Sequence, residues 1–386
     1  MEQMHEFDDI RPLYDEEVPG VIEELLDDPE FKRVVFFLLP DTDWEIFKTT
    51  MRSFKTKKEF QDGIVRQTVK YITDKTTSSL DLGGVENVSK NKAYAYLSNH
   101  RDIIMDASAL CILLADAGLD TTEIAIGDNL LIHPWIDKFV RLNKSFIVQR
   151  GVSIRQMLEV SGKLSRYIHY SIREKNQSIW MAQREGRSKD SNDYTQESLL
   201  KMLCLAGKNF IEGIKNVNIA PISISYEYDP CDFLKATEFQ LKRDNPEYKK
   251  SPLDDLINME TGLFGFKGNV HFQIGHPIND KIDESIERLE KQEQPAAVAH
   301  LINREIHLNY QFYPGNYIAF DKLSDKPRFE NRYTDQEVEV FEKYIQERLD
   351  MIKLENKDIN FLTKKLLEMY ANPLKNYLKA KEESLN

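Results

Sequence analysis

A histidine and two carboxylates follow a short apolar segment, and their types and spacing suit proton transfer. Residues 93–98 read as a buried strand, and His100 comes almost directly after it. Asp102 and Asp106 lie at the start of an apolar helical pattern over 103–117. An imidazole held by a carboxylate can take a proton from a hydroxyl group near neutral pH. The alternative interpretation is a helix-capping loop in which these polar side chains are solvated.

Two arginines follow later strands of the same pattern. Arg150 closes one strand, and Arg187 lies in a charged glycine turn after another. A guanidinium suits a phosphate or carboxylate, and Gly186 lets the backbone approach an anion without a Cβ in the way. Glu185 could accept a hydrogen bond from a hydroxyl or pair with an arginine. Residues 141–189 hold eleven Lys and Arg but three Asp and Glu, a net +8 inside a chain of net −12, which predicts an anionic ligand or partner.

Four blocks in this order resemble those of the glycerol-phosphate and lysophospholipid acyltransferase superfamily. Each block is a short apolar strand that runs into polar residues, and the resemblance covers about residues 90–280. The His-Arg start of the first block is closer to the glycerol-3-phosphate acyltransferase branch. The blocks span residues 94–106, 146–150, 180–189 and 219–226.

The resemblance implies that His100 is the general base on an acceptor hydroxyl and that an aspartate orients it. In the family four residues separate the two side chains, whereas five separate His100 from Asp106. The apolar run before Asp106 matches the family arrangement, so Asp106 is favoured and Asp102 is the second candidate. The extra residue requires a bulge or a shifted start of the helix.

The other blocks imply substrate binding. Arg150 and Arg187 match arginines that contact the acceptor phosphate in the family. Pro221 stands in the apolar-Pro-apolar strand that lines the acyl-donor side. The third block, Glu-Gly-x-Arg-Ser in the family, is one residue shorter in this chain, which leaves the place of its glutamate open; it consists of Glu185, Gly186, Arg187 and Ser188.

The activity implied by the resemblance is transfer of a fatty acyl group from acyl-CoA or acyl-carrier protein to the hydroxyl of glycerol 3-phosphate. No covalent intermediate is needed, and the sequence has no Gly-x-Ser-x-Gly elbow. The thioester is then a co-substrate, and we expect no cofactor and no metal. Because the products are lipids, the protein is expected at the cytoplasmic face of a membrane. Two alternatives stay open: a lysophosphatidate-type acceptor, and a catalytically degenerate protein of the same fold that binds lipid or carrier protein.

Composition and motifs argue against several other classes. The net charge of −12 over 386 residues disfavours nucleic-acid binding. No apolar run reaches the roughly 18–20 residues of a membrane span, and the acidic N-terminal segment lacks a signal-peptide pattern. The three cysteines lie far apart in the sequence, which predicts a reducing, cytoplasmic setting. Neither they nor the eight histidines show metal-ligand spacing. A kinase catalytic loop would need an Asn where Ala107 stands and a later Asp-Phe-Gly.

Alternating strands and helices must position these side chains. They predict an α/β fold with a mostly parallel mixed sheet flanked by helices, because that order of elements is typical of it. Strands are predicted over 93–98, 123–126, 145–149, 178–182, 219–226 and 269–274. Helices are predicted between them, over 103–117, 130–142, 154–174 and 196–215.

Three regions follow from this pattern: a helical N-terminal region (1–88), an α/β acyltransferase domain (89–280) and a helical C-terminal region (281–386). Thr and Ser residues followed by Gly-Gly predict a linker over 76–84. Residues 229–268 are charged and interrupted by prolines, and are predicted as an excursion before the last strand. Ser98-Asn99 is predicted to cap the helix that follows His100.

Overall fold

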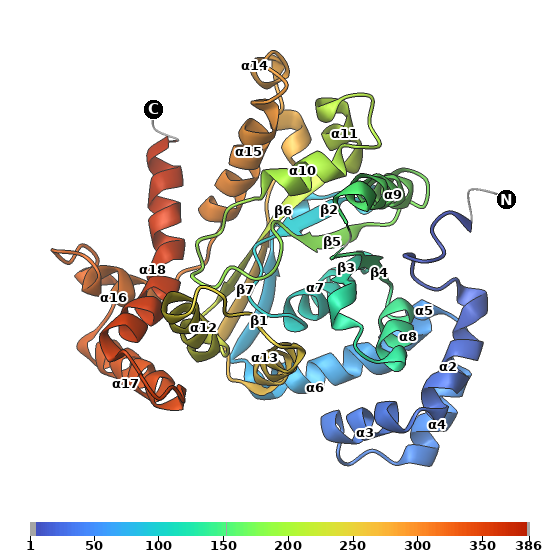
Figure 1. Ribbon diagram of the computed structural model, residues 1–386, viewed down its shortest axis with the longest axis horizontal. Coiled ribbons are helices and arrows are strands. Elements are labelled where there is room, and N and C mark those ends of the chain that lie inside the picture. The colour runs from blue at the N-terminus through green and yellow to red at the C-terminus, as the bar shows by residue number, and fades with distance from the viewer. Residues whose placement is uncertain (1–4, 152, 384–386) are drawn as a thin grey trace.

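A seven-stranded sheet forms the centre of the protein (Figure 1). The computed structural model describes residues 5–151 and 153–383. The strand order is β1-β7-β6-β2-β5-β3-β4, and neighbouring strands are parallel except for the antiparallel pair β6 and β7. The predicted α/β fold with a mostly parallel mixed sheet is therefore confirmed. The strands are β1 Ser79–Gly83, β2 Ala95–Ser98, β3 Glu123–Gly127, β4 Ser145–Val148, β5 Ile179–Ala182, β6 Ile219–Tyr226 and β7 Asn269–Ile274.

The six predicted strands are present, but the linker predicted over 76–84 is wrong. Five of its residues form the edge strand β1, which runs parallel to β7 from the pair Ser79 and Asn269 onward. None of the five side chains is buried. An edge strand that is short and half-solvated lacks the dense apolar pattern of a central strand, and its final glycines read as a turn.

Alternate side chains of β2 enter separate cores on the two faces of the sheet. Ala95 and Leu97 pack with residues of α9, α10, α11 and α15, whereas Tyr96 and Tyr94, which directly precedes the strand, pack with residues of α7. This two-residue alternation is the pleat of a strand that is buried on both faces. The covering helices lie on opposite sides of the sheet (Figure 1); they are α7 Met105–Asp116, α9 Ile154–Arg173, α10 Glu197–Leu203, α11 Phe210–Val217 and α15 Gln294–Leu308.

The single helix predicted over 196–215 is in fact two helices, α10 and α11. A Cβ on Gly207 would lie 2.5 Å from the Cα of Gly213, so the chain turns there with backbone against backbone. Asn209 then caps the next helix, since its Oδ1 accepts a hydrogen bond from the Glu212 N–H at 2.9 Å. The glycine and the asparagine stop one helix and start another within a continuous apolar pattern.

The residues between β2 and α7 also differ from the prediction. Asn99 does not cap the helix: its side chain exchanges two 2.8 Å hydrogen bonds with the backbone of Ile224 and so extends the pairing of β2 with β6. The helix begins at Met105 rather than 103, because Oδ1 of Asp102 accepts hydrogen bonds from the N–H groups of Ile104 (2.9 Å) and Met105 (2.7 Å). The capping role thus belongs to one of the two candidate carboxylates.

The N-terminal helices form a separate small core beside the sheet. Ile22, Leu25, Phe31 and Met51 are buried together, and Leu142 of α8 joins them. Aspartates cap two of these helices through bonds to backbone N–H groups. The helices are α2 Val18–Asp27, α3 Pro29–Leu38, α4 Trp44–Ser53, α5 Lys57–Phe60, α6 Arg66–Thr76 and α8 Pro134–Leu142, with a π-helical turn at Gln61–Val65 between α5 and α6.

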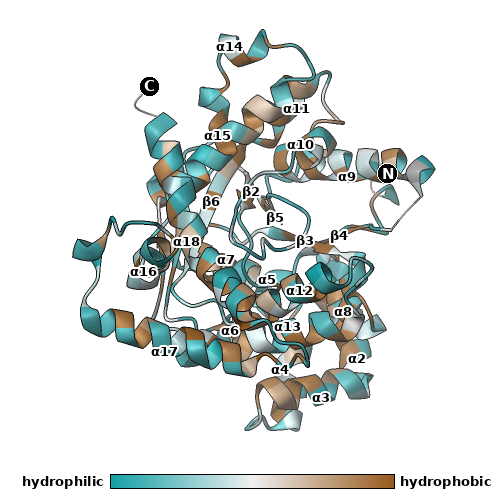
Figure 2. Cartoon of the chain, turned by 60° about the vertical axis from the view of Figure 1, so that its left-hand side comes forward, coloured by the Kyte–Doolittle hydropathy of each residue, from teal (hydrophilic) through white to brown (hydrophobic). Residues whose placement is uncertain are grey.

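The region predicted as an excursion and the C-terminal region are helical. Bands of hydrophobic and hydrophilic residues alternate along α17 and α18 (Figure 2), and α17 buries Phe341, Ile345 and Leu349 at four-residue spacing. Two helices, α12 and α13, lie between β6 and β7 in the chain. The bounds are α12 Asp232–Asp244, α13 Pro252–Phe264, α14 Glu284–Glu287, α16 Pro314–Lys322, α17 Asp335–Met351 and α18 Ile359–Glu383.

Candidate active site

The His100 imidazole and the Asp106 carboxylate meet at the carboxyl end of β2. Nδ1 of His100 lies 2.8 Å from Oδ2 of Asp106. The same oxygen accepts hydrogen bonds from the N–H groups of Arg101 (2.6 Å) and Asp102 (3.1 Å). The Tyr226 hydroxyl, at the end of β6, donates to the other oxygen at 2.9 Å. Five intervening residues are accommodated because the helix starts late and the loop before it wraps around the carboxylate.

These contacts keep Asp106 ionised although it is fully buried. Burial alone would raise its pKa, but the hydrogen bond and the charge of His100, with the N–H groups of Arg101 and Asp102, outweigh burial and lower the pKa. The carboxylate occupies Nδ1 of His100, so Nε2 is the ring nitrogen left for a substrate hydroxyl. Trp180 packs edge-on against the imidazole, with ring centres 5.5 Å apart, and so limits its rotation.

Asp102, the second candidate carboxylate, does not contact His100. Its Oδ1 caps α7, and its Oδ2 is buried with no hydrogen-bond partner among the described residues. A Cβ on Gly262 would lie 1.8 Å from that oxygen, so α13 packs directly on it. Burial first, and the charge of Asp106 second, raise the pKa of Asp102. Two carboxylates four positions apart thus have opposite environments, and Asp106 has the geometry of the partner of His100.

Arg150 and Glu185 pair across the outer part of the candidate site. Nη1 of Arg150 lies 3.7 Å from Oε1 of Glu185, and both side chains are substantially exposed. The backbone of Arg150 is anchored by its N–H, which donates to Oδ1 of Asp128 at 3.1 Å. This pair is worth little in free energy because water screens it, so a stronger anionic ligand could displace the glutamate.

The third block forms a turn around Arg187. Gly186 has φ +68°, a left-handed conformation that favours glycine, whereas no atom lies within 4 Å of where its Cβ would be. Gly186 therefore suits the turn, and the approach of an anion to its backbone stays a prediction. Ser188 is buried and donates to atoms of Asp190 and Asn192, each at 3.2 Å, which places its hydroxyl within the loop.

The Arg187 guanidinium is held from one side only. Nη2 donates to Oδ1 of Asn258 on α13 at 2.9 Å, while Nη1 is buried with no hydrogen-bond partner among the described residues. An unpaired buried donor is costly and favours an anionic acceptor. The guanidinium is close enough to Asp102 to lower the pKa of that carboxyl, against the larger effect of burial.

Pro221 lies within β6, in register with Leu97 of β2, and its carbonyl accepts a hydrogen bond from the N–H of Gly275 at 2.8 Å. The proline is therefore a buried residue of the sheet that supports the strand leading to Tyr226. Its place on an acyl-donor side stays a prediction.

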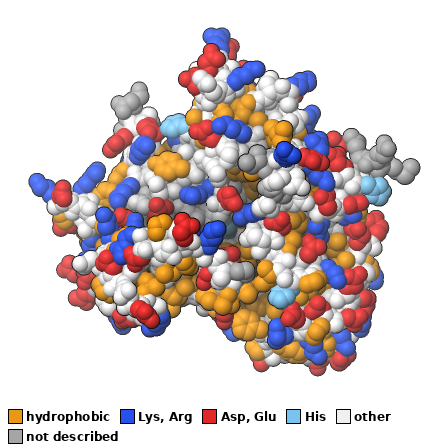
Figure 3. Space-filling model, in the orientation of Figure 1, with side chains coloured by type: hydrophobic (Ala, Val, Ile, Leu, Met, Phe, Trp, Pro, Cys, Tyr) orange, Lys and Arg blue, Asp and Glu red, His pale blue; other side chains and the backbone are white. Residues whose placement is uncertain are grey.

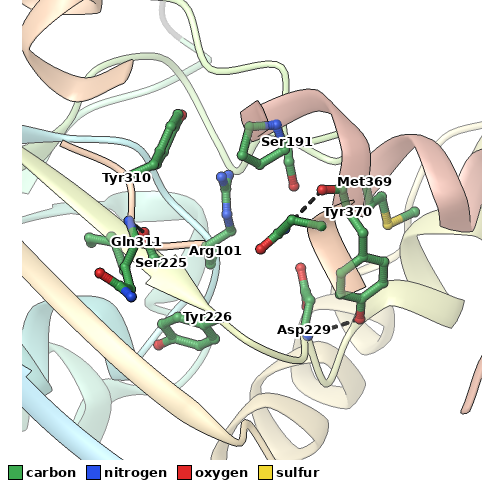
Figure 4. Close-up of a pocket in the computed structure, with 12 residues that line it drawn as sticks. Arg101, Ser191, Ser225, Tyr226, Asp229, Tyr310, Gln311, Met369 and Tyr370 are labelled. Atoms are coloured by element: carbon green, nitrogen blue, oxygen red, sulfur yellow. Dashed lines mark hydrogen bonds between the residues drawn. The ribbon is translucent and has the colours of Figure 1, made fainter. Parts of the chain in front are cut away.

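Arg101, which completes the His-Arg pair, turns away from His100. It forms a buried ion pair with Asp193, with 2.8 and 2.5 Å contacts, and the Tyr310 hydroxyl donates to the same carboxylate at 2.5 Å. Arg101, Tyr226 and Tyr310 line a pocket with an empty volume of about 400 Å³, open solvent included (Figure 4). Arg101 is thereby a structural link between the His100 loop and the C-terminal region.

Sequence reasoning missed Tyr226 and Asn258. Tyr226 ends a predicted strand at the same sheet edge as His100, and that position is a signal that could have found it. Asn258 lies 71 residues from Arg187, in a segment without a motif, and nothing in the sequence pattern pairs the two.

The comparisons with known proteins are sparse. No family model matches the sequence, and no curated protein matches it. Among solved structures, the chain is similar to the 1-acyl-sn-glycerophosphate (LPA) acyltransferase PlsC from Thermotoga maritima, at 14% identity and a TM-score of 0.37. That similarity covers 78% of this chain and 100% of the other. Among the described residues, none of the helices combines the length and apolar character of a bilayer crossing.

Proposed function

We propose that the protein is an O-acyltransferase of the glycerol-phosphate and lysophospholipid acyltransferase kind. The observation that carries this proposal is the 2.8 Å contact of His100 with Asp106 at a sheet edge that also bears Arg150 and Arg187. Glycerol 3-phosphate is the first candidate acceptor and a lysophosphatidate the second. Acyl-CoA and acyl-carrier protein are the candidate donors.

The reaction is direct transfer. Nε2 of His100 takes the proton of the acceptor hydroxyl while that oxygen attacks the thioester carbonyl carbon, which forms the ester C–O bond. The C–S bond breaks, and the departing thiolate takes the proton from the imidazolium. Asp106 holds the tautomer with its proton on Nδ1 and stabilises the imidazolium, as the carboxylate does in a serine-protease triad.

Arg150 and Arg187 supply the anion-binding part of the mechanism. A phosphate bound between the strand ends would orient the neighbouring hydroxyl toward His100, which lowers the entropic part of the barrier. The weak, exposed pair of Arg150 with Glu185 supports this role, because a ligand can reach its guanidinium donors. Arg187 supports it because, among the described residues, no carboxylate forms an ion pair with its guanidinium.

The test is a screen of purified protein that crosses acyl-CoA and acyl-carrier protein with glycerol 3-phosphate, lysophosphatidate and glycerol. We expect ester formation with a phosphorylated acceptor and far less with glycerol. Thioester binding without turnover on any acceptor would instead favour the degenerate binding protein.

Association with a lipid surface is part of the proposal. Leu253, Leu256, Ile257 and Phe264 are exposed on one face of α13 beside Glu260, and Phe37 of α3 contacts Phe264 edge-on at 5.4 Å. Hydrophobic side chains gather on this part of the surface (Figure 3). The opposite face of α13 contacts Arg187, so this apolar face adjoins the site where a lipid product would form.

Co-sedimentation with phospholipid vesicles tests this part. We expect the protein to pellet with vesicles and the double variant Phe37→Ser/Phe264→Ser to pellet less. Val340→Ser, a change at a 52% exposed position on α17, serves as the control. Absence of vesicle binding by the unmodified protein would contradict it.

A further inference from the structure

The inner face of α13 closes on the two polar groups of the site that lack full hydrogen bonding. Asn258 holds Arg187, and Gly262, one turn later, packs on Asp102. Soluble helices commonly place apolar side chains inside, but this one has an asparagine and a glycine facing the site. These two residues therefore fit the site, while Leu263 of the same helix packs into an apolar core with residues of α6 and α7.

The amide of Asn258 has a fixed orientation. Asn258 is 5% exposed, and its Nδ2 donates to the backbone carbonyl of Asp254 at 2.7 Å. The Ser251 capping box holds the start of the same helix. Because Nδ2 is committed to a carbonyl, Oδ1 must face Arg187; the flipped amide would direct its N–H groups at a guanidinium. The Sγ of Cys231 contacts the Asn258 carbonyl at 3.4 Å and further ties the helix to the loop after β6.

Asn258 is also uncharged, and a comparison with Arg101 and Arg150 explains why this matters. Arg101 is neutralised by Asp193 in a buried ion pair, and Arg150 lies near Glu185. Among the described residues, Arg187 forms no ion pair within 4 Å, and its direct partner is a neutral amide oxygen. An amide fixes the direction of a guanidinium but leaves its positive charge for a ligand.

We infer that Asn258 is a positioning residue that holds Arg187 for a phosphate-bearing acceptor and so sets the affinity for that substrate. This inference rests on the proposed acyltransferase function. Asn258 acts through Arg187 and has no role in proton transfer. It is therefore expected to affect the KM of the acceptor, with little effect on kcat and on the KM of the thioester.

The experiment compares N258D, N258A and the unmodified protein in steady-state transfer to glycerol 3-phosphate. In N258D a carboxylate of nearly the same shape competes with the phosphate for Arg187. We therefore expect the acceptor KM to rise about tenfold or more, which is the change expected when a ligand loses one charge-assisted hydrogen bond. In N258A the guanidinium loses the hydrogen bond that orients it, and we expect the acceptor KM to rise about threefold to tenfold. N245D is the matched control, because Asn245 is an exposed asparagine at the end of α12 and the variant adds the same charge.

The possible outcomes distinguish failure of the positioning role of Asn258 from failure of the proposed acyltransferase function. If the unmodified protein transfers acyl groups to glycerol 3-phosphate but both Asn258 variants keep its acceptor KM within twofold, the inference is overturned and the acyltransferase stands. Equal changes in kcat, both KM values and Tm would show a merely structural role and also overturn it. If the unmodified protein acylates no phosphorylated acceptor, both proposals fall together. Should N258D not fold, N258A decides between the first two outcomes.

Discussion

The two halves of the candidate site differ in how completely their polar atoms are hydrogen-bonded. In the proton-transfer half, Asp106 receives donors from the His100 ring, two backbone N–H groups and Tyr226. In the anion-binding half, Nη1 of Arg187 is buried without a hydrogen-bond partner among the described residues.

This contrast indicates what each half is built to do. A fully bonded carboxylate keeps one orientation and one charge, which a general base needs from its partner throughout the reaction. A buried donor without a partner lowers stability, and such groups recur at functional sites. Under the proposed function, the first half is therefore preorganised, and the second half is the part that the substrate completes.

Removing the Arg187 side chain disrupts the second half and, among the variants that compare the two halves, should have the largest effect on the reaction. We expect Arg187→Ala to lower kcat/KM for a phosphorylated acceptor by about 10- to 100-fold, the value of a hydrogen bond to a charged group, with the thioester KM unchanged. Arg173→Ala, the control, removes the same charge at the C-terminal end of α9, near the opposite end of the sheet. Equal losses for glycerol and glycerol 3-phosphate would contradict a phosphate role.

The two aspartates offer a matched pair for the first half. At pH 7 we expect Asp106→Asn to lower the free energy of unfolding by about 2 kcal/mol, because a buried hydrogen-bonded carboxylate is lost. We expect Asp102→Asn to be neutral or stabilising, since its amide oxygen can still cap α7 and the cost of burying a charge disappears. Urea unfolding measures both.

The pH dependence of these variants has opposite signs. The pKa of Asp106 is lowered in the folded state, so its contribution is present above about pH 4 and is lost as the pH falls through the folded-state pKa. The destabilisation by Asp106→Asn should therefore shrink in acid. The pKa of Asp102 is raised in the folded state. Any gain in the free energy of unfolding from Asp102→Asn should therefore vanish at low pH, where Asp102 is protonated in both the folded and the unfolded protein. If the free energy of unfolding changed with pH in the same way for both variants, the environments of the two aspartates would not differ.

Tyr226→Phe removes one donor to Asp106 and should cost about 1 kcal/mol of stability, with a few-fold loss in kcat. Tyr333→Phe removes a 2.9 Å bond to Asp321 far along the chain and serves as the control. A thermal melt and a kcat measurement on both variants check this: similar losses of stability are expected, with a change in kcat for Tyr226→Phe alone. An unchanged kcat would place Tyr226 outside the proton-transfer half.

Gly186→Ala should have the smallest effect, a loss of about 1 kcal/mol, because a side chain is disfavoured at φ +68° although space is available. Gly20→Ala, in helix α2 and also with open space, should instead gain up to about 1 kcal/mol. Chemical denaturation of both variants measures the difference. Stabilisation by Gly186→Ala would contradict the left-handed conformation of this turn.

Sequence patterns predict the first half of the site better than the second. His100 and Asp106 lie close together in the chain, where a strand, a loop and a helix start fix their meeting. The six predicted strands are likewise local apolar runs. By contrast, β1 is too short and exposed to stand out, and Asn99 bonds to Ile224 across the sheet rather than capping the helix beside it.

The anion-binding half depends on contacts between distant segments. Arg187 meets Asn258, and Arg101 meets Asp193, 92 residues away. Turn sequence identifies the arginines as candidates, but only the packing of α13 and of the C-terminal helices decides which guanidinium is neutralised and which stays available. Local periodicity carries no information about such pairs.

The central claim is that His100 activates an acceptor hydroxyl for attack on an acyl thioester. The most direct test measures ester formation from acyl-CoA and glycerol 3-phosphate by the unmodified protein and by His100→Ala, with matched Tm values. We predict that the unmodified protein forms the ester and that the variant is slower by about 10²- to 10⁴-fold. A variant that retained most of the transfer rate would contradict the account.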